Sequence, residues 1–294
     1  MTQDRERCAD GCVRRGDPAG ASAPPVNHWL LVEQPGPWGQ DPWRESALPL
    51  HVVAAIAAQA AAAHARVLLI RRPGRSVPGV RRWAYVDSRP GHERAWWTTF
   101  TDPDELLDLR LTEGEPSTDP IYLVCAHGKH DTCCAIRGRP VAAALAKARP
   151  DQTWECSHVG GDRFAANVVV LPHGLYYGQV AAAHGPVIAE RYEAGLVDVA
   201  HLRGRSTYSA PAQAAQQFAR ERVGEARLDA FPPLSARRVG HEQWEVELGT
   251  PTGPLRVEVR AVFQRSDTPL TCTATTPAAI RHFELVRWPD RAPG

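Results

Sequence analysis

The sequence has no long apolar run, no apolar leader and no marked excess of either charge. No stretch of its 294 residues approaches the roughly 18 apolar residues that cross a membrane. Residues 1–8 have no apolar core of the kind that secretory signals carry. The 34 basic and 33 acidic residues leave a net charge of +1, which gives no electrostatic reason to bind nucleic acid or anionic lipid. We therefore expect a cytoplasmic protein that binds neither nucleic acid nor a membrane.

Two familiar motifs are also missing. The sequence has no C-x-x-C pair, and this argues against an ordinary thiol–disulfide exchange reaction. It has no G-x-G-x-x-G segment after a strand, so it shows no fingerprint for a flavin or nicotinamide cofactor. It identifies no pair of carboxylates suited to a sugar cleft, so nothing indicates a glycosidase.

Cysteine is the informative residue type that is present. There are seven, and in a reducing compartment an odd set favours metal, cluster or redox roles over a disulfide framework. Four of them lie in two short segments, 125–134 and 156–162, where histidines accompany them as further soft ligands. Cys8 and Cys12 lie in a stretch rich in Gly, Asp and Arg, and Cys272 lies in an apparent strand. We interpret these three as unpaired thiols without a role.

The first part of the chain reads as strand, helix, strand and hairpin, the element order of a thioredoxin-like half. The expected elements are strands at 28–33 and 66–71, a helix at 50–65, and a hairpin of 83–87 with 94–100.

The same order then recurs without sequence repetition. The expected elements are strands at 121–125 and 153–156, a helix at 139–148, a hairpin of 166–172 with 175–179, and a helix at 187–194.

The last part of the chain differs in composition. Residues 211–230 read as a polar helix, and 243–248 and 255–263 alternate apolar and polar residues as two antiparallel strands do. We therefore predict an α/β protein of two thioredoxin-like halves with a C-terminal antiparallel β appendage. Its expected parts are a flexible N-terminus (1–26), an N-terminal half (27–115), a second half (116–204) and a C-terminal helix with a small antiparallel sheet (205–294).

The two cysteine-bearing segments follow the ends of predicted strands, where chain direction is fixed and a loop supplies reach. Cys125 and Cys134 bracket an eight-residue loop. His158 and Asp162 are separated by three residues around Gly160–Gly161, so their side chains could meet one site. The two glycines allow the backbone to approach a bound group closely and to donate N–H groups to it.

Several other interpretations of these residues stay open. The C-x8-C spacing differs from that of zinc fingers. A lone catalytic cysteine with His127 or His158 as its base is chemically possible, as are a strained disulfide between Cys133 and Cys134 and a purely structural cysteine-bearing core. We interpret His127 and His130 as supporting or surface residues rather than ligands.

The motif C-x-H-G-x-x-D-x-x-C at 125–134, followed by S-H-V-G-G at 157–161 and R-F-A at 163–165, resembles the sucrase/ferredoxin-like proteins. These carry a thioredoxin-like ferredoxin domain, and the P-G-P-W-G loop at 35–39 fits the same family. The resemblance covers roughly residues 8–200. It implies a [2Fe–2S] cluster, which relatives hold with C-x8-C and H-x3-H ligands.

At the matching positions of this sequence, the resemblance implies that Cys125, Cys134 and His158 are cluster ligands. Where the relatives have a second histidine, this chain has Asp162. A carboxylate is harder and more negative than imidazole, so we expect it to lower the reduction potential and make the centre more labile. The alternatives for this position are Cys156, Cys133, a water or external ligand, or loss of the cluster.

An iron–sulfur centre near a surface passes single electrons. The sequence therefore predicts an iron–sulfur electron-transfer or redox-sensing protein with an unidentified redox partner protein, an electron carrier rather than a stand-alone enzyme. One alternative is a cluster-free thiol-dependent redox enzyme with Cys125 or Cys134 as nucleophile. Another is a non-enzymatic interaction protein that binds its partner through residues 205–294.

Overall fold

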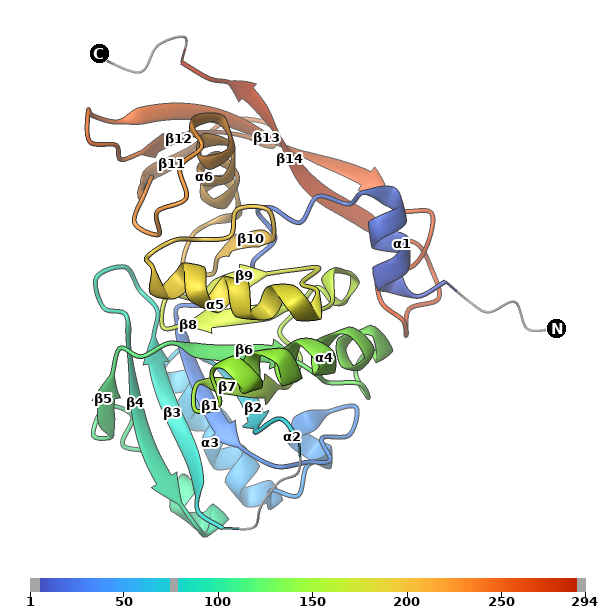
Figure 1. The fold of residues 1–294 in the computed structure, drawn as a ribbon, viewed down its shortest axis with the longest axis vertical. Coiled ribbons are helices and arrows are strands. Elements are labelled where there is room, and N and C mark those ends of the chain that lie inside the picture. The colour runs from blue at the N-terminus through green and yellow to red at the C-terminus, as the bar shows by residue number, and fades with distance from the viewer. Residues whose placement is uncertain (1–5, 75–78, 290–294) are drawn as a thin grey trace, which may run out of the picture.

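Two separate β-sheets organise the described residues, 6–74 and 79–289, of this computed structural model (Figure 1). In spatial order the strands of the larger sheet are β10 (Leu202–Arg205), β9 (Leu175–Tyr177), β8 (Val168–Leu171), β6 (Ile121–Cys125), β7 (Thr153–Cys156), β2 (Ala65–Arg71), β1 (His28–Glu33), β3 (Arg81–Asp87), β4 (Arg94–Phe100) and β5 (Glu115–Ser117). The helices are α1 (Cys8–Arg15), α2 (Pro42–Glu45), α3 (Leu50–Ala62), α4 (Thr132–Ala148), α5 (Gly185–Glu193) and α6 (Ala210–Val223), with short 3₁₀ helices at Pro103–Leu107, Asp162–Phe164 and Ala182–His184.

The larger sheet is built from one strand arrangement used twice. In the first half β1 pairs parallel with β2 and antiparallel with β3, which pairs with β4. In the second half β6 pairs parallel with β7 and antiparallel with β8, which pairs with β9. A helix follows the first strand in both, α3 after β1 and α4 after β6. The halves join where β2 runs antiparallel to β7, with Ile70 opposite Cys156.

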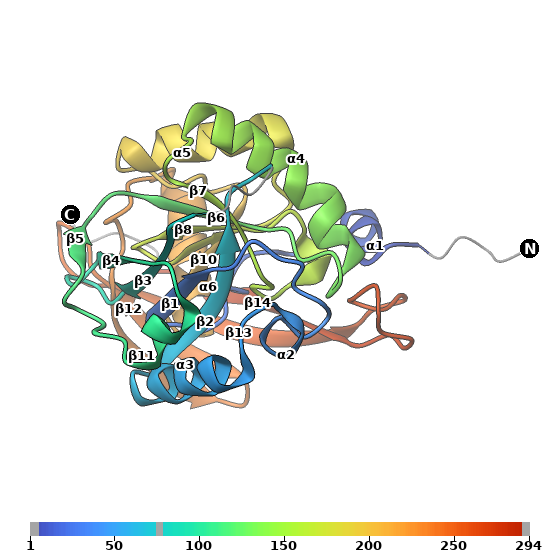
Figure 2. The same ribbon diagram turned by 90° about the horizontal axis from the view of Figure 1, so that it is seen from below.

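The sheet curls so that the two halves share a central apolar cluster. Alternate residues of a strand face opposite sides. In β1, Trp29 belongs to the central cluster, whereas Leu30 packs with Ile56 of α3. In β6, Leu123 belongs to the central cluster, whereas Tyr122 packs on the side of α4 and α5. The helices therefore cover the outer faces, and Figure 2 shows α4 and α5 on one side and α3 on the other.

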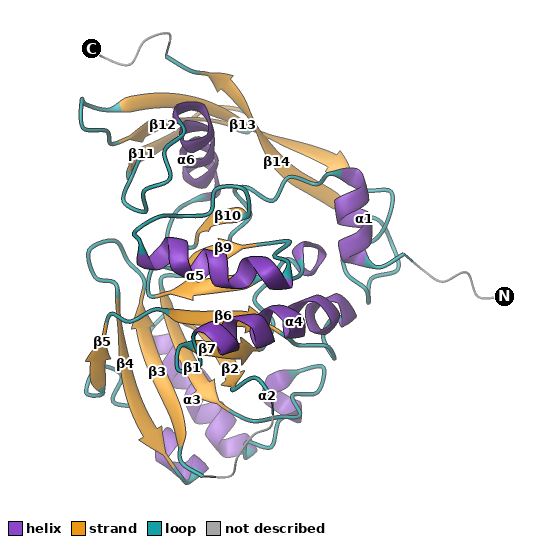
Figure 3. Cartoon of the chain, viewed as in Figure 1, coloured by secondary structure: helices purple, strands orange, loops and turns teal. Residues whose placement is uncertain are grey.

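The smaller sheet lies at the β10 end of the molecule, next to α6 (Figure 3). Its strands are β11 (Pro233–Gly240), β12 (Gln243–Leu248), β13 (Leu255–Arg265) and β14 (Ala279–Arg287), all antiparallel. Alanines along α6 pack on apolar residues of this sheet. The predicted α/β class and the antiparallel C-terminal sheet are thus confirmed. None of the helices in the described parts of the chain combines the length and apolarity that a membrane span requires.

Three expectations about local structure were wrong. The helix expected at 139–148 begins at Thr132, so Cys134, expected at the end of a loop, lies in its first turn. The stretch 1–26, expected to have no element, contains α1; its residues 1–5 lie outside the described part, as do 290–294 of the C-terminal region. Cys8 and Cys12 of α1 are buried, so tertiary packing stabilises a helix too short to show a periodic pattern. Cys272, expected in a strand, lies in the loop 266–278 between β13 and β14, where flanking prolines interrupt the β-branched run.

The hairpin between β8 and β9 carries a histidine that makes stability depend on pH. Burial, helped by the nearby Arg205 and opposed by Glu93, lowers the pKa of His173 to about 4, and Tyr192 contacts its Nδ1. The unfolded state therefore binds the extra proton first, and stability is lost as the pH falls from about 6.5 towards 4, by about 3 kcal/mol. When the free energy of unfolding is measured by chemical denaturation at several pH values, His173→Asn should lose less stability than the wild type as the pH falls. The same pH dependence in both proteins would show that His173 does not cause the loss.

Candidate metal centre

The parallel strands β6 and β7 bring the two predicted ligand segments to one edge of the sheet. Cys125 ends β6 directly opposite Cys156, which ends β7. The loop after β6 enters α4, whose first turn contains Cys134. The loop after β7 passes through His158 to the 3₁₀ helix that begins at Asp162. The carboxyl ends of neighbouring parallel strands are a common place for binding sites.

Four side chains converge there, and Cys125, Cys134, His158 and Asp162 are called the first donor group below. Ligand atoms of Cys125, Cys134 and His158 all lie within 4.8 Å of one another. The Cys134 thiol donates to Asp162 Oδ1 over 3.3 Å, and His158 Nδ1 lies 3.0 Å from the same oxygen. The structure thus brings together all four residues that sequence analysis selected.

The charges in this group depend on one another. The neighbouring Cys134 thiol, reinforced by His158, lowers the pKa of Cys125 well below its usual value despite complete burial. Burial opposes the charged form of His158, but the Asp162 carboxylate and Cys125 outweigh it and raise the pKa of His158 to about 9. Burial likewise opposes the ionised form of Asp162, yet His158 lowers its pKa. The group therefore favours a thiolate, an imidazolium and a carboxylate in contact.

These donors fit a soft metal or cluster. Two sulfurs and an imidazole suit iron–sulfur or zinc centres, and a carboxylate completes a set of four. His158 Nδ1 is buried and has no hydrogen bond of acceptable geometry, although a carboxylate oxygen is near. A buried nitrogen without a good partner is costly, and coordination of a metal would satisfy it.

The turn before Asp162 is held from behind by a buried cation. Arg203 is 2% exposed, and its guanidinium donates to the carbonyl of Gly160 and the side chain of Asn167. Among the described residues no carboxylate forms a salt bridge with it, and burial lowers the pKa of Arg203 to about 10. Gly161 at this turn makes room for that guanidinium, a packing role that the sequence did not reveal.

Gly161→Ala should therefore destabilise the protein. Gly161 has φ +82°, and a Cβ there would lie 2.6 Å from Arg203 Nη2. We expect the free energy of unfolding to fall by about 3 kcal/mol, because left-handed backbone strain and overpacking act together. Gly195→Ala is the matched control, since its φ is +72° but no atom lies within 4 Å of the added Cβ; it should cost about 1 kcal/mol. Equal losses in urea unfolding would rule out the packing role.

The loop histidines, expected to be supporting or surface residues, lie close to the first donor group. His127 is buried and its Nε2 contacts the carbonyl of Gly39 over 2.8 Å, which ties the P-G-P-W-G loop of the first half to the centre. The ring of His130 stacks on that of His158, with centroids 3.9 Å apart. Its Nε2 lies 3.8 Å from Asp162 Oδ2, so His130 also reaches the site, a position that sequence spacing did not reveal.

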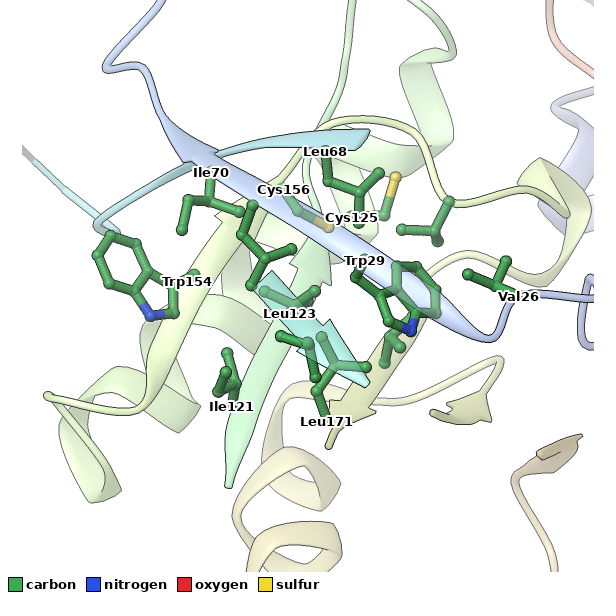
Figure 4. Close-up of a cluster of buried hydrophobic side chains, with 14 of the residues drawn as sticks. Val26, Trp29, Leu68, Ile70, Ile121, Leu123, Cys125, Trp154, Cys156 and Leu171 are labelled. Atoms are coloured by element: carbon green, nitrogen blue, oxygen red, sulfur yellow. The ribbon is translucent and has the colours of Figure 1, made fainter. Parts of the chain in front are cut away.

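Cys156, the sequence alternative for the fourth position, lies in the central apolar cluster. Figure 4 shows it beside Cys125 and among apolar side chains that include Ile70 and Trp154. Burial and the neighbouring Cys125 raise its pKa well above the usual value. Its thiol is not part of the converging donor atoms found among the described residues.

Cys133 belongs to a different group of donors. Its thiol lies 3.4 Å from that of Cys272, which in turn lies 3.6 Å from that of Cys8. The sequence does not predict this convergence, since its local pattern indicates that Cys8 and Cys272 are thiols without a role. The available signal was the adjacent pair Cys133–Cys134, because neighbouring residues point in different directions and can serve two sites.

Comparison with known proteins gives two matches of different extent. The sequence model described as sucrase/ferredoxin-like matches residues 20–204, more than half of the 294-residue chain. Altered inheritance of mitochondria protein 32 from Meyerozyma guilliermondii is 32% identical over 78 residues, which cover 23% of this chain and 28% of that protein. The chain thus matches less than a third of that relative's length. No solved structure matches significantly.

Proposed function

This chain belongs to the sucrase/ferredoxin-like family, and on that premise we propose that it is an electron-transfer or redox-sensing protein whose first donor group holds a [2Fe–2S] cluster. The observation that carries the proposal is the convergence of two thiols, an imidazole and a carboxylate at the ends of two parallel strands. In this arrangement Cys125, Cys134, His158 and Asp162 are the ligands. The bound group supplies one-electron transfer.

The surrounding residues are suited to an anionic centre. Two thiolates and the Asp162 carboxylate bring negative charge into a buried place, where it is costly unless compensated. Arg203 supplies a buried positive charge at the Gly160 turn, and Arg66 donates to the carbonyl of His158 over 2.9 Å. These guanidinium groups hold the loop in place and offset the charge of its ligands.

The exposed edge of the centre is its histidine side. The His158 side chain is 23% exposed and that of His130 is 38% exposed, whereas Cys125 and Cys134 are fully buried. We propose that a redox partner protein exchanges electrons across this edge, because transfer is fastest where the centre lies nearest the surface.

We further propose that residues 27–115 and 116–204 are two thioredoxin-like halves, that the second half is the ferredoxin domain, and that 205–294 is an added C-terminal part. The repeated strand order of the larger sheet supports the two halves. All seven cysteines are free thiols, and this supports a reducing compartment such as the cytoplasm.

The lowered pKa of Cys125 favours a second candidate, a cluster-free thiol-dependent redox enzyme. Against it stands the burial of Cys125, which is 0% exposed, since a nucleophile must reach its substrate. Iodoacetamide distinguishes the candidates: rapid alkylation of Cys125 alone in iron-free folded protein would favour the enzyme.

The test of the cluster is chemical analysis of protein purified without oxygen. A [2Fe–2S] centre requires iron and acid-labile sulfide in equal amounts, about two of each per chain. Iron without sulfide, or neither after reconstitution with both, would refute the proposal.

A further inference from the structure

A second set of soft donors meets outside the first donor group. It comprises the Cys8, Cys133 and Cys272 thiols with the Asp131 carboxylate, and is called the second donor group below. Its ligand atoms all lie within 4.8 Å of one another, and all but Cys272 are buried. Three thiols in one place are too many for one disulfide, and in this structure all three are free.

The distances match those between the ligands of a tetrahedral zinc ion. A Zn–S bond of about 2.3 Å places two sulfurs about 3.8 Å apart. The Cys133–Cys272 and Cys272–Cys8 sulfurs are 3.4 and 3.6 Å apart, well beyond the roughly 2.05 Å of a disulfide bond. The Cys8 sulfur lies 3.6 Å from Asp131 Oδ2, which suits a sulfur and an oxygen bound to one metal.

The carboxylate is held in a fixed orientation. Asp131 Oδ1 accepts a hydrogen bond from the backbone N–H of Cys133 over 2.8 Å, and Oδ2 accepts one from Cys272 N–H over 2.6 Å. The same residue caps the N-terminus of α4. These bonds leave lone pairs on both oxygens, and hydrogen-bonded carboxylates of this kind are suitable metal ligands.

We propose that Cys8, Cys133, Cys272 and Asp131 form a zinc site that is distinct from the iron–sulfur centre. Cys133 and Cys134 are neighbours in the first turn of α4, and each serves one of the two sites. Thiolate-rich sets of three sulfurs and one further ligand are typical of structural zinc, and zinc binding displaces the thiol protons.

The site would join three segments that are far apart in the chain. Cys8 comes from α1, Cys133 from α4, and Cys272 from the loop 266–278 between β13 and β14. Figure 1 shows α1 beside that loop, and Figure 2 shows both near one end of α4. Arg14 and Arg15 of α1 also pair with Asp267 of the loop. Zinc would therefore attach the smaller sheet and α1 to the half that carries the first donor group.

The test is metal analysis of protein produced with zinc and iron in the medium. We expect about one zinc per chain in the wild type and less than a tenth of that in Cys272→Ser, with unchanged iron and sulfide, because Cys272 lies outside the first donor group. Cys12→Ser is the matched control. Cys12 lies one turn after Cys8 on α1, is buried, and contacts Gln179 rather than the second donor group, so this variant should retain zinc.

A Cys125→Ser variant separates this proposal from the iron–sulfur proposal. It should lose iron and sulfide but keep its zinc. Zinc that is lost in Cys125→Ser and kept in Cys272→Ser would place the metal in the first donor group and overturn the second site. So would wild-type protein that fails to bind zinc when titrated under reducing conditions, or a Cys133–Cys272 disulfide in protein isolated anaerobically.

Discussion

Cys134→Ser should lower the iron content of the purified protein at least about tenfold, since a serine oxygen is a poor substitute for thiolate at an iron–sulfur cluster. Cys134 is fully buried, and its thiol contacts Asp162 within the first donor group. Loss of one of two sulfur ligands leaves too few soft donors for the cluster. The measurement is iron and acid-labile sulfide per chain, together with visible absorption.

Cys156→Ala provides the control for this result. Cys156 is as buried as Cys134 and lies on the neighbouring strand directly opposite Cys125, but its thiol packs in the central apolar cluster. This variant should keep its iron and sulfide. If Cys156→Ala loses the cluster and Cys134→Ser retains it, the ligand set is wrong and Cys156, not Cys134, is the second sulfur ligand.

Asp162→His should raise the reduction potential, by on the order of 100 mV, since imidazole ligands stabilise the reduced state relative to anionic ones. The change removes a negative charge from a place where Arg203 already supplies a buried cation. It also adds a ligand nitrogen that can take up a proton, so the potential of the variant should fall more steeply with rising pH. Redox titration followed by visible absorption or EPR measures both effects.

Asp162→Glu is the matched change, because it keeps a carboxylate and moves it by one methylene. Its potential should stay close to that of the wild type if the cluster assembles. A potential that is the same in Asp162→His, Asp162→Glu and wild type would show that the residue is not a ligand. His130, whose Nε2 lies 3.8 Å from Asp162 Oδ2, would then be the next residue to replace.

The sequence predicted the elements that depend on strong local patterns. The strand–helix–strand–hairpin order was recognisable because apolar runs such as those of β1 and β6 are bounded by turns. It did not reveal α1 or the loop position of Cys272, because long-range packing determines both. The pairing of β2 with β7, which makes one sheet of two halves, also has no local signal.

The candidate site could likewise be predicted from the sequence only in part. Convergence of Cys125 with His158 could be anticipated because their segments follow strands that the fold places side by side. The second donor group could not, since Cys8 and Cys272 are separated by most of the chain and meet only when α1 and the C-terminal loop fold against α4. Arg203 was missed for the same reason, as its role depends on the turn that it supports.

EPR spectroscopy of the anaerobically purified, dithionite-reduced protein is the most direct test of the [2Fe–2S] assignment. We expect a spin-½ signal with the g values of a reduced [2Fe–2S] cluster, integrating to about one spin per chain, and absent in Cys134→Ser. Reduced protein that contains its full complement of iron yet shows no such signal would contradict it, as would a signal that persists undiminished in Cys134→Ser.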